Sequence, residues 1–257
     1  MIAPYYHSDR VTLYLGDCKV IMPGMADNSV DAIITDLPYG TTACKWDTII
    51  PFIPMWAQVK RVLKANGAFI TTASQPFTSA LIMSNLDWFK YELIWEKEQG
   101  KQPLLAKIQP MKAHENIIVF GGGRIKYNPQ MTTGEIYTDK RTCLIKSEHG
   151  DHYKVPIINK NTRYPISVVK FRQINSAGNH PTQKPVALME YLINTYTNEG
   201  DTVLDFCMGS GSTGVAAMKL NRRFIGIELS EEYCEIAKAR IHAAELMAEA
   251  DLFKPKG

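Results

Sequence analysis

The stretch TVLDFCMGSGSTGVAAMKLNRRFIGIE, residues 202–228, decides the fold. Its pattern predicts a β-strand over 202–206, a glycine loop over 209–214, a helix over 215–220 and a strand over 223–228. Glycines let backbone approach a ligand closely, and the start of a helix offers free N–H groups to an anion. Glu228 lies 19 residues after Gly209, a spacing at which a carboxylate can accept from both hydroxyls of a ribose. The stretch therefore predicts the nucleotide-binding half of an α/β domain, with NAD and S-adenosylmethionine both open as ligands.

Asp205 favours S-adenosylmethionine over a dinucleotide. It stands at the end of the predicted strand, four residues before Gly209. A carboxylate there would repel a pyrophosphate but can meet the ammonium of a methionine moiety.

A second strand that ends on an acid lies near the other end of the chain. Residues 30–35 form a buried-looking strand, which Asp36-Leu37-Pro38-Tyr39-Gly40 follows directly. In an open α/β sheet the carboxyl ends of the strands face the ligand crevice. Proline fixes the turn so that backbone carbonyls point outward, and tyrosine offers a flat face on which an aromatic ring can stack. A carboxylate and a carbonyl together can grip an exocyclic aromatic amine and direct its lone pair at an electrophile without a covalent intermediate.

The remaining pattern alternates between strands and helices, which predicts a mainly parallel sheet covered on both faces. Further strands are expected over 11–15, 68–73, 91–95 and 116–120, and helices over 54–63, 77–84, 186–196 and from Ser230 onward. Gly67 is expected to close the helix that begins at Pro54.

Length and composition exclude several classes of protein. With 257 residues, 45% of them apolar and 21% charged, the chain suits one large α/β domain, or a catalytic domain with a sizeable insertion, rather than a disordered or coiled-coil protein. The longest apolar run, Ile49–Ala57, is too short to span a bilayer, and no secretory signal begins the chain, so a cytoplasmic protein is expected. The five cysteines and six histidines are dispersed, so we expect neither disulfides nor a metal site.

Positive charge is concentrated in one segment. Residues 122–178 hold ten Lys/Arg and four Asp/Glu, a net charge of +6 in a chain whose total is +3. Basic residues interleaved with tyrosines and histidines suit contact with nucleic acid, although an ordinary solvated insertion would look similar. The candidate contacts are Arg124, Lys126, Lys140, Arg141, Lys146, Arg163, Lys170 and Arg172.

Taken together, these motifs resemble those of β-class amino-methyltransferases that act on DNA, the N6-adenine/N4-cytosine type. That family carries an early D-P-P-Y motif, a central target recognition region and a late F-x-G-x-G motif. They match Asp36-Leu37-Pro38-Tyr39, residues 122–178 and Phe206-Cys207-Met208-Gly209-Ser210-Gly211. Further likeness lies in Leu15–Cys18, Arg61–Lys64 and His180–Pro185, so the resemblance covers nearly the whole chain.

The resemblance implies a Rossmann-like class I methyltransferase fold in which residues 1–121 form the catalytic half and 179–257 the cofactor-binding half. It implies that Asp36, Leu37, Pro38 and Tyr39 are catalytic. The implied S-adenosylmethionine contacts are Asp17, Thr182, Lys184, Asp205, Phe206, Gly209, Gly211 and Glu228. Thr182 and Lys184 would approach the methionine carboxylate, and Asp17 the adenine of the cofactor.

One position departs from the family pattern. Leu37 stands where the family has its first proline. Leucine still offers a backbone carbonyl, but it lacks the fixed φ that the proline ring imposes. The aspartate at position 36, rather than a serine, favours adenine over cytosine within this family.

The sequence therefore predicts an enzyme that flips a base out of double-stranded DNA and methylates the N6 of adenine. N4-cytosine methylation, methylation of RNA or of a protein amide, a NAD-binding oxidoreductase and an inactive DNA-binding module are the alternatives. A homodimer and a cognate restriction endonuclease are left open as partners.

Overall fold

The computed structural model describes residues 2–41, 47–101, 103–139, 143–145, 150–154, 157–159, 161–173 and 183–252. The chain divides into a main unit, Met1–Asn128 with Ser167–Gly257, and an inserted unit, Pro129–Ile166. The sequence places the recognition region at 122–178, and the inserted unit lies within that range.

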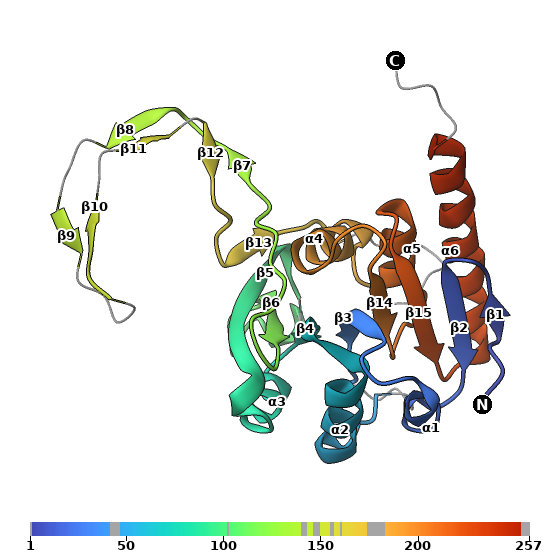
Figure 1. The fold of residues 1–257 in the computed structure, drawn as a ribbon. Helices are drawn as coiled ribbons and strands as arrows, with labels where there is room; N and C mark the ends of the chain where they lie inside the picture. Colours follow the sequence, from blue (N-terminus) through green and yellow to red (C-terminus); the bar gives the residue numbers. More distant parts are fainter. Residues whose placement is uncertain are drawn as a thin grey trace. The chain divides into compact units, whose positions relative to one another are not determined.

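A nine-stranded sheet forms the centre of the main unit (Figure 1). The order is β1 (Tyr6–His7), β2 (Val11–Leu15), β15 (Arg223–Glu228), β14 (Thr202–Asp205), β3 (Val30–Asp36), β4 (Leu63–Ala73), β6 (Lys112–Phe120), β5 (Phe89–Lys101) and β13 (Val168–Lys170). The run from β2 to β4 is parallel, as is the pairing of β13 with β5, whereas β1 and β6 pair antiparallel with their neighbours. The expected mainly parallel α/β sheet is confirmed.

Helices cover both faces of this sheet (Figure 1). One face carries α1 (Cys18–Ile21), α2 (Phe52–Val62) and α3 (Phe77–Met83), and the other carries α4 (Val186–Tyr196), α5 (Ser212–Lys219) and α6 (Glu231–Leu252). Because side chains alternate across a strand, β3 supplies both cores: Ile34 joins the cluster under α4–α6, and Ile33 joins the cluster under α1–α3. Three short 3₁₀ turns occupy Met22–Gly24, Leu86–Trp88 and Pro103–Leu105.

Local pattern gave the bounds of some elements correctly, and the structure corrects others: β5 and β6 are longer than the expected 91–95 and 116–120, and α5 begins at Ser212 rather than at 215. The strands at 11–15 and 223–228 and the helix at 186–196 have the expected bounds. Gly67, however, does not close α2: the helix ends at Val62, and Leu63 already pairs with Val30 as the first residue of β4. Glycine is needed at 67 for a different reason, since a Cβ there would lie 2.8 Å from the carbonyl oxygen of Asp31.

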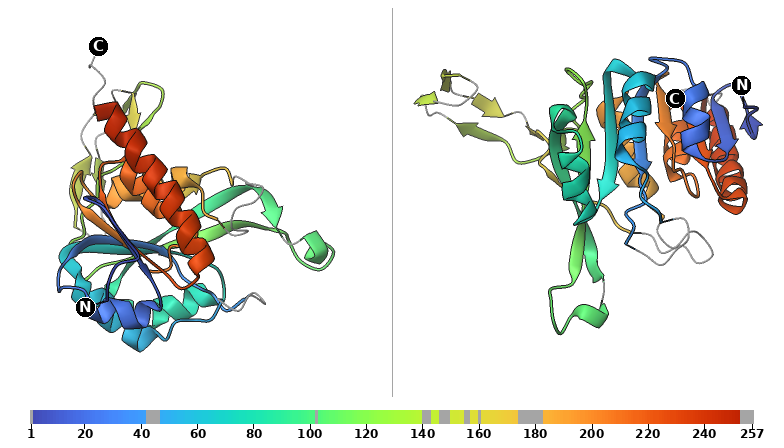
Figure 2. Two further views of the ribbon diagram at one scale, coloured as in Figure 1. Left: turned by 90° about the vertical axis from the view of Figure 1, so that its right-hand side faces the viewer. Right: turned by 90° about the horizontal axis from the view of Figure 1, so that it is seen from below.

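Strands β5 and β6 continue beyond their neighbours as a hairpin, with the third 3₁₀ turn near its tip (Figure 2). The bases of both strands remain in the sheet, where Trp95 pairs with Glu115. The position of this hairpin matters for the site, because side chains near its base line the cavity described below.

The inserted unit is a series of antiparallel pairs. β7 (Thr132–Thr133) pairs with β12 (Thr162–Arg163), β8 (Tyr137–Asp139) with β11 (Ile157–Asn159), and β9 (Cys143–Ile145) with β10 (His152–Lys154). The sequence predicted no strands here. Within the described residues, no helix of the chain is both long and apolar enough to cross a membrane.

Candidate active site

A cavity of about 630 Å³ opens at the carboxyl ends of the parallel strands of the main unit. The last residues of three strands line it: Asp36 of β3, Asp205 of β14 and Glu228 of β15. The two halves predicted from sequence, the catalytic loop and the glycine loop, therefore meet in one site. This is the crevice in which open α/β sheets bind their ligands.

Three donors surround the carboxylate of Asp36. Its Oδ1 accepts hydrogen bonds from Tyr39 Oη at 2.7 Å and from Thr72 Oγ1. Its Oδ2 accepts from Lys184 Nζ at 2.6 Å. Thr72 is in place because β4 lies parallel to β3 with Thr72 opposite Asp36. The carboxylate is thus held in one orientation at the mouth of a cavity.

Tyr39 is held by its ring and by its hydroxyl. The ring packs against Phe77 with centroids 5.3 Å apart, and the hydroxyl bonds Asp36. Burial, and then the charge of Asp36, raise the pKa of Tyr39 well above its ordinary value. The phenol therefore stays protonated and keeps donating to Asp36. Tyr39 also lines the cavity, where its ring can meet a planar group.

The turn after Tyr39 depends on a residue that the sequence did not single out. Asp47 is buried, and its carboxylate accepts from the backbone N–H of Gly40 at 2.8 Å and of Thr41 at 2.9 Å. Gly40 has φ +68°, a conformation that favours glycine. Leu37 is buried in the core beneath α1–α3, and Pro38 lines the cavity.

The glycine loop turns tightly around Glu228. Gly209 N–H donates to Glu228 Oε2, and Ser230 N–H donates to Oε1, both at 2.8 Å. Burial raises the pKa of Glu228 despite these two hydrogen bonds. Gly211 has φ +79°, and a Cβ there would lie 2.9 Å from that of Ala237, so only glycine fits without a shift.

Asp205 is the most deeply buried carboxylate in the cavity, with 3% of its surface exposed. It accepts from Thr35 Oγ1 at 2.7 Å and from Cys207 N–H at 3.1 Å. Burial raises the pKa of Asp205 to about 6, against an ordinary value of 3.8. A cationic ligand group would therefore find a carboxylate here that water does not screen.

The other predicted cofactor contacts that the structure describes line the cavity, but Lys184 does not lie where the prediction placed it. Asp17 lines the cavity and caps α1 by accepting from Lys19 N–H at 2.9 Å. Phe206 lines the cavity but is 2% exposed and packs against Phe69, so it also belongs to the core. Lys184 lies on Asp36 rather than on the glycine loop. Thr182 lies outside the described residues.

The structure brings further polar side chains to the cavity. Glu115 lies 3.4 Å from the Lys184 ammonium and also pairs with Lys97, and both line the cavity. Ser212 lines it too, and among the described residues its buried Oγ has no hydrogen-bond partner. Nothing in the local sequence marks Glu115, because its partners stand 18 and 69 positions away. Trp95, on β5, borders the cavity but is fully buried and belongs to the core beneath α4–α6.

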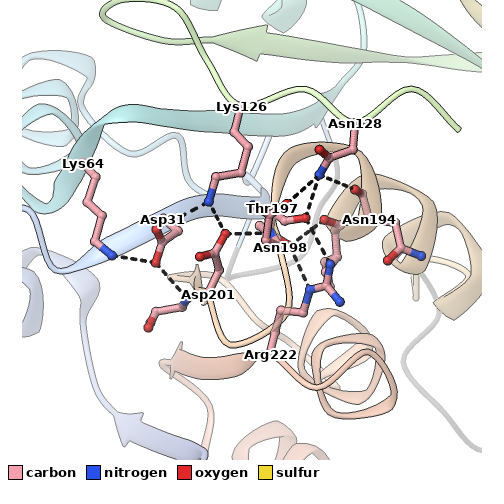
Figure 3. Close-up of polar contacts among 11 residues, drawn as sticks. Asp31, Lys64, Lys126, Asn128, Asn194, Thr197, Asn198, Asp201 and Arg222 are labelled. Atoms are coloured by element: carbon pink, nitrogen blue, oxygen red, sulfur yellow. Dashed lines mark hydrogen bonds and ion pairs between the residues drawn. The ribbon is translucent and has the colours of Figure 1, made fainter.

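Lys126 belongs to a cluster of polar contacts that joins segments of the main unit (Figure 3). Its ammonium pairs with Asp201 and lies 3.8 Å from Asp31, near the amino ends of β14 and β3. Asp31 also accepts from Lys64 at 2.8 Å and from Thr202 N–H at 3.0 Å. The expected phosphate contact through Lys126 would require breaking this cluster, which favours a structural role.

The other predicted DNA contacts remain candidates. Arg124 is exposed, Lys170 lies 3.2 Å from Glu96, and Arg172 lies 3.5 Å from Glu98 on the surface. Arg163 donates within the inserted unit to the carbonyls of Thr162 and Glu135. Lys140, Arg141 and Lys146 lie outside the described residues.

A mainly parallel sheet with an acidic loop and a glycine loop at its carboxyl edge defines a class I methyltransferase site. Residues 30–239 match the family described as DNA methylase (N6_N4_Mtase), and the chain belongs to that family.

Individual relatives match along most of their length. The chain is 28% identical to the type II methyltransferase M2.MboI of Moraxella bovis, over 94% of this chain and 92% of the relative. It is also 28% identical to the DNA adenine methyltransferase YhdJ of Escherichia coli K12, over 98% and 89%.

Solved structures of DNA methyltransferases are also similar to this chain over most of its length. The M1.HpyAVI–SAM complex has a TM-score of 0.62 and 26% identity, covering 90% of this chain and 99% of that one. The cytosine-N4-specific PvuII DNA methyltransferase has a TM-score of 0.67 but 17% identity, covering 95% and 94%, and therefore shows the fold alone.

Proposed function

We propose that this protein transfers the methyl group of S-adenosylmethionine to the N6 amine of an adenine in double-stranded DNA. The observation that carries the proposal is the Asp36 carboxylate, held at the end of β3 in the same cavity as Asp205, Gly209 and Glu228. The name of one of the two relatives, the DNA adenine methyltransferase YhdJ, supports adenine as the target. The aspartate at position 36 agrees with this choice through the family resemblance.

The residues present fit this cofactor. Asp205 offers a buried carboxylate to the ammonium, and Glu228 offers carboxylate oxygens at the distance along the chain that suits ribose hydroxyls. Ser212 presents a buried hydroxyl without a partner among the described residues, which a polar ligand would satisfy. When bound, the cofactor supplies a methyl group activated on a sulfonium.

The chain's own residues then act on the target amine. The adenine N6 is a poor nucleophile because its lone pair is delocalised into the ring. Hydrogen bonds from its two N–H groups to Asp36 and to a carbonyl of Leu37 or Pro38 would turn that lone pair toward the methyl group. As the N–C bond forms and the C–S bond breaks, the amine loses a proton, which Asp36 would accept through the hydrogen bond that it makes to this amine.

The proposal is tested by methyl transfer from labelled S-adenosylmethionine to unmethylated DNA of mixed sequence, followed by nucleoside mass spectrometry. N6-methyladenine is the expected product. N4-methylcytosine would contradict the target atom, and no product from a protein that binds the cofactor would contradict DNA as substrate.

Asp36→Ala is the matched variant for the catalytic role. Loss of the positioned carboxylate should lower the transfer rate by about 10²–10⁴-fold, while cofactor affinity stays within a fewfold of wild type. Turnover near the wild-type rate in this variant would refute the role of Asp36.

The homodimer and the cognate restriction endonuclease stay predictions. Measurement of the size of the protein in solution tests the first, and co-purification of an endonuclease tests the second.

A further inference from the structure

Four charged side chains that alternate in sign run along one wall of the cavity. Asp36 Oδ2 lies 2.6 Å from Lys184 Nζ, Lys184 Nζ lies 3.4 Å from Glu115 Oε2, and Glu115 Oε1 pairs with Lys97. The side chains of Lys184, Glu115 and Lys97 are between 9% and 14% exposed, so water screens these contacts little. The row connects the end of β3, two strands of a hairpin and the segment before α4.

The hydrogen bonds at Asp36 differ between its two oxygens. Each carboxylate oxygen has capacity for about two hydrogen bonds. Oδ1 already accepts two, from Tyr39 and Thr72, whereas Oδ2 accepts one, from Lys184. The free acceptor position of Asp36, to which an incoming amine could donate, is therefore on Oδ2. The ammonium of Lys184 and the target amine would share that oxygen.

Lys184 is in turn kept charged by its neighbours. Burial alone would lower the pKa of Lys184, but the carboxylates of Asp36 and Glu115 outweigh burial and raise it to about 12. For Glu115, burial acts to raise the pKa, and Lys184 and Lys97 reverse that effect and lower it. The charges of Lys184 and Glu115 are thus each maintained by opposite charges beside them.

We infer that Lys184 is a positioning residue, whose ammonium fixes the Oδ2 edge of Asp36 for the target amine, and that Glu115 and Lys97 hold Lys184 there. The inference rests on the proposed function, because it takes an exocyclic amine as the group that meets Asp36. It replaces the role expected from the family resemblance, in which Lys184 binds the methionine carboxylate. A carboxylate ligand would bring a third negative charge to an ammonium that already faces two.

The two roles predict different kinetics for Lys184→Met, which keeps length and removes charge. A positioning role predicts a single-turnover rate at saturating cofactor about 10²-fold below wild type, with a cofactor dissociation constant within about threefold. A rate within about threefold of wild type at saturating cofactor would overturn the inference, whatever the change in cofactor affinity. Lys219→Met is the control, since Lys219 makes a comparable 2.9 Å pair with Glu190 on an exposed surface.

Glu115→Gln tests the second half of the inference. If Glu115 acts through Lys184, its removal slows transfer in the wild-type background but adds nothing to Lys184→Met. Independent, multiplicative effects in the double variant would refute the connection. Circular dichroism and thermal unfolding of each variant identify any that fail to fold.

A second experiment needs no catalytic activity. Acetic anhydride labelling across a pH series, read by peptide mass spectrometry, reports the reactivity of Lys184 in the purified protein. Asp36→Asn, which keeps the shape of the side chain, should make Lys184 at least about tenfold more reactive at neutral pH, with Lys219 unchanged. Equal reactivity in both proteins would overturn the Asp36–Lys184 contact. If wild type instead methylates cytosine or transfers no methyl, the proposed function fails, and labelling still decides this contact.

Discussion

Replacing Asp205 with asparagine should stabilise the protein without cofactor and remove its ability to bind the cofactor. The carboxylate is 3% exposed, and burial raises its pKa to about 6. The folded protein therefore binds the Asp205 proton more tightly than the unfolded chain does. As pH rises from about 4 to about 6, the fold loses stability on account of this group, and above that range the loss is constant.

The magnitude follows from the difference between the two pKa values. A difference of about 2 corresponds to about 3 kcal/mol at neutral pH, which is the upper limit of what neutralising the group can recover. Asparagine keeps an oxygen that can accept from Thr35 Oγ1 and Cys207 N–H. For a chain of this length the gain corresponds to a rise of up to about 10 °C in melting temperature at pH 8.

The assay combines thermal unfolding with titration of S-adenosylmethionine. At pH 8 the Asp205→Asn protein should melt higher than wild type, and at pH 4 the difference should shrink. Wild-type affinity for the cofactor should fall about tenfold per pH unit below about pH 6, because protonation removes the partner of the ammonium. If the variant melts lower than wild type at pH 8 and binds the cofactor normally, two claims are refuted: that the buried Asp205 charge destabilises the fold, and that it binds the ammonium of the cofactor.

The remaining predictions concern the basic residues. Lys126→Met should lower the free energy of unfolding by about 1–3 kcal/mol in urea titrations, because it leaves Asp201 and Asp31 without their shared cation; Lys219→Met, which removes an exposed pair with Glu190, is the control. The same Lys126→Met variant should leave the salt dependence of DNA binding unchanged, and a flatter slope would return Lys126 to the DNA contacts. Alanine at Lys140, Arg141 and Lys146 together should weaken binding to all sequences and flatten the plot of log affinity against log salt by about 0.9 for each phosphate that the variant no longer neutralises. Unchanged affinity and slope would remove these three from the interface.

The sequence predicted those parts of the fold that depend on neighbours along the chain. Strand β15 and helix α4 have the bounds expected from periodicity, because burial on one or two faces leaves a repeating pattern in consecutive residues. The boundary at Leu63 was missed for the opposite reason. A lysine, an alanine and an asparagine before Gly67 suit a helix end locally, but Leu63 pairs with Val30 in a neighbouring strand. Tertiary pairing overrode the local signal.

The residues of the candidate site also fall into those that local sequence can predict and those that only contacts between distant segments reveal. Asp36, Asp205 and Glu228 could be found because each ends a strand, and parallel strands bring their ends to one edge. The family resemblance implies a cofactor contact for Lys184 because this lysine lies within the His180–Pro185 motif, but its partner in the structure is 148 positions away. A contact between Lys184 and Glu115 has no signature in either segment alone. The inserted unit gave no strand pattern because its strands are only two or three residues long.

Leu37 shows how the fold can supply what a motif lacks. A proline at this position would restrict the loop through its own ring, and leucine gives up that restriction. In the structure, the Leu37 side chain is 4% exposed and belongs to the core beneath α1–α3. Asp47 holds the two backbone N–H groups that follow Tyr39, and Tyr39 itself bonds Asp36. The Asp36–Tyr39 loop is therefore anchored within the motif and directly after it by contacts to the rest of the main unit. Loop rigidity here comes from packing and hydrogen bonds, which is why the loss of the proline is compatible with a positioned Asp36.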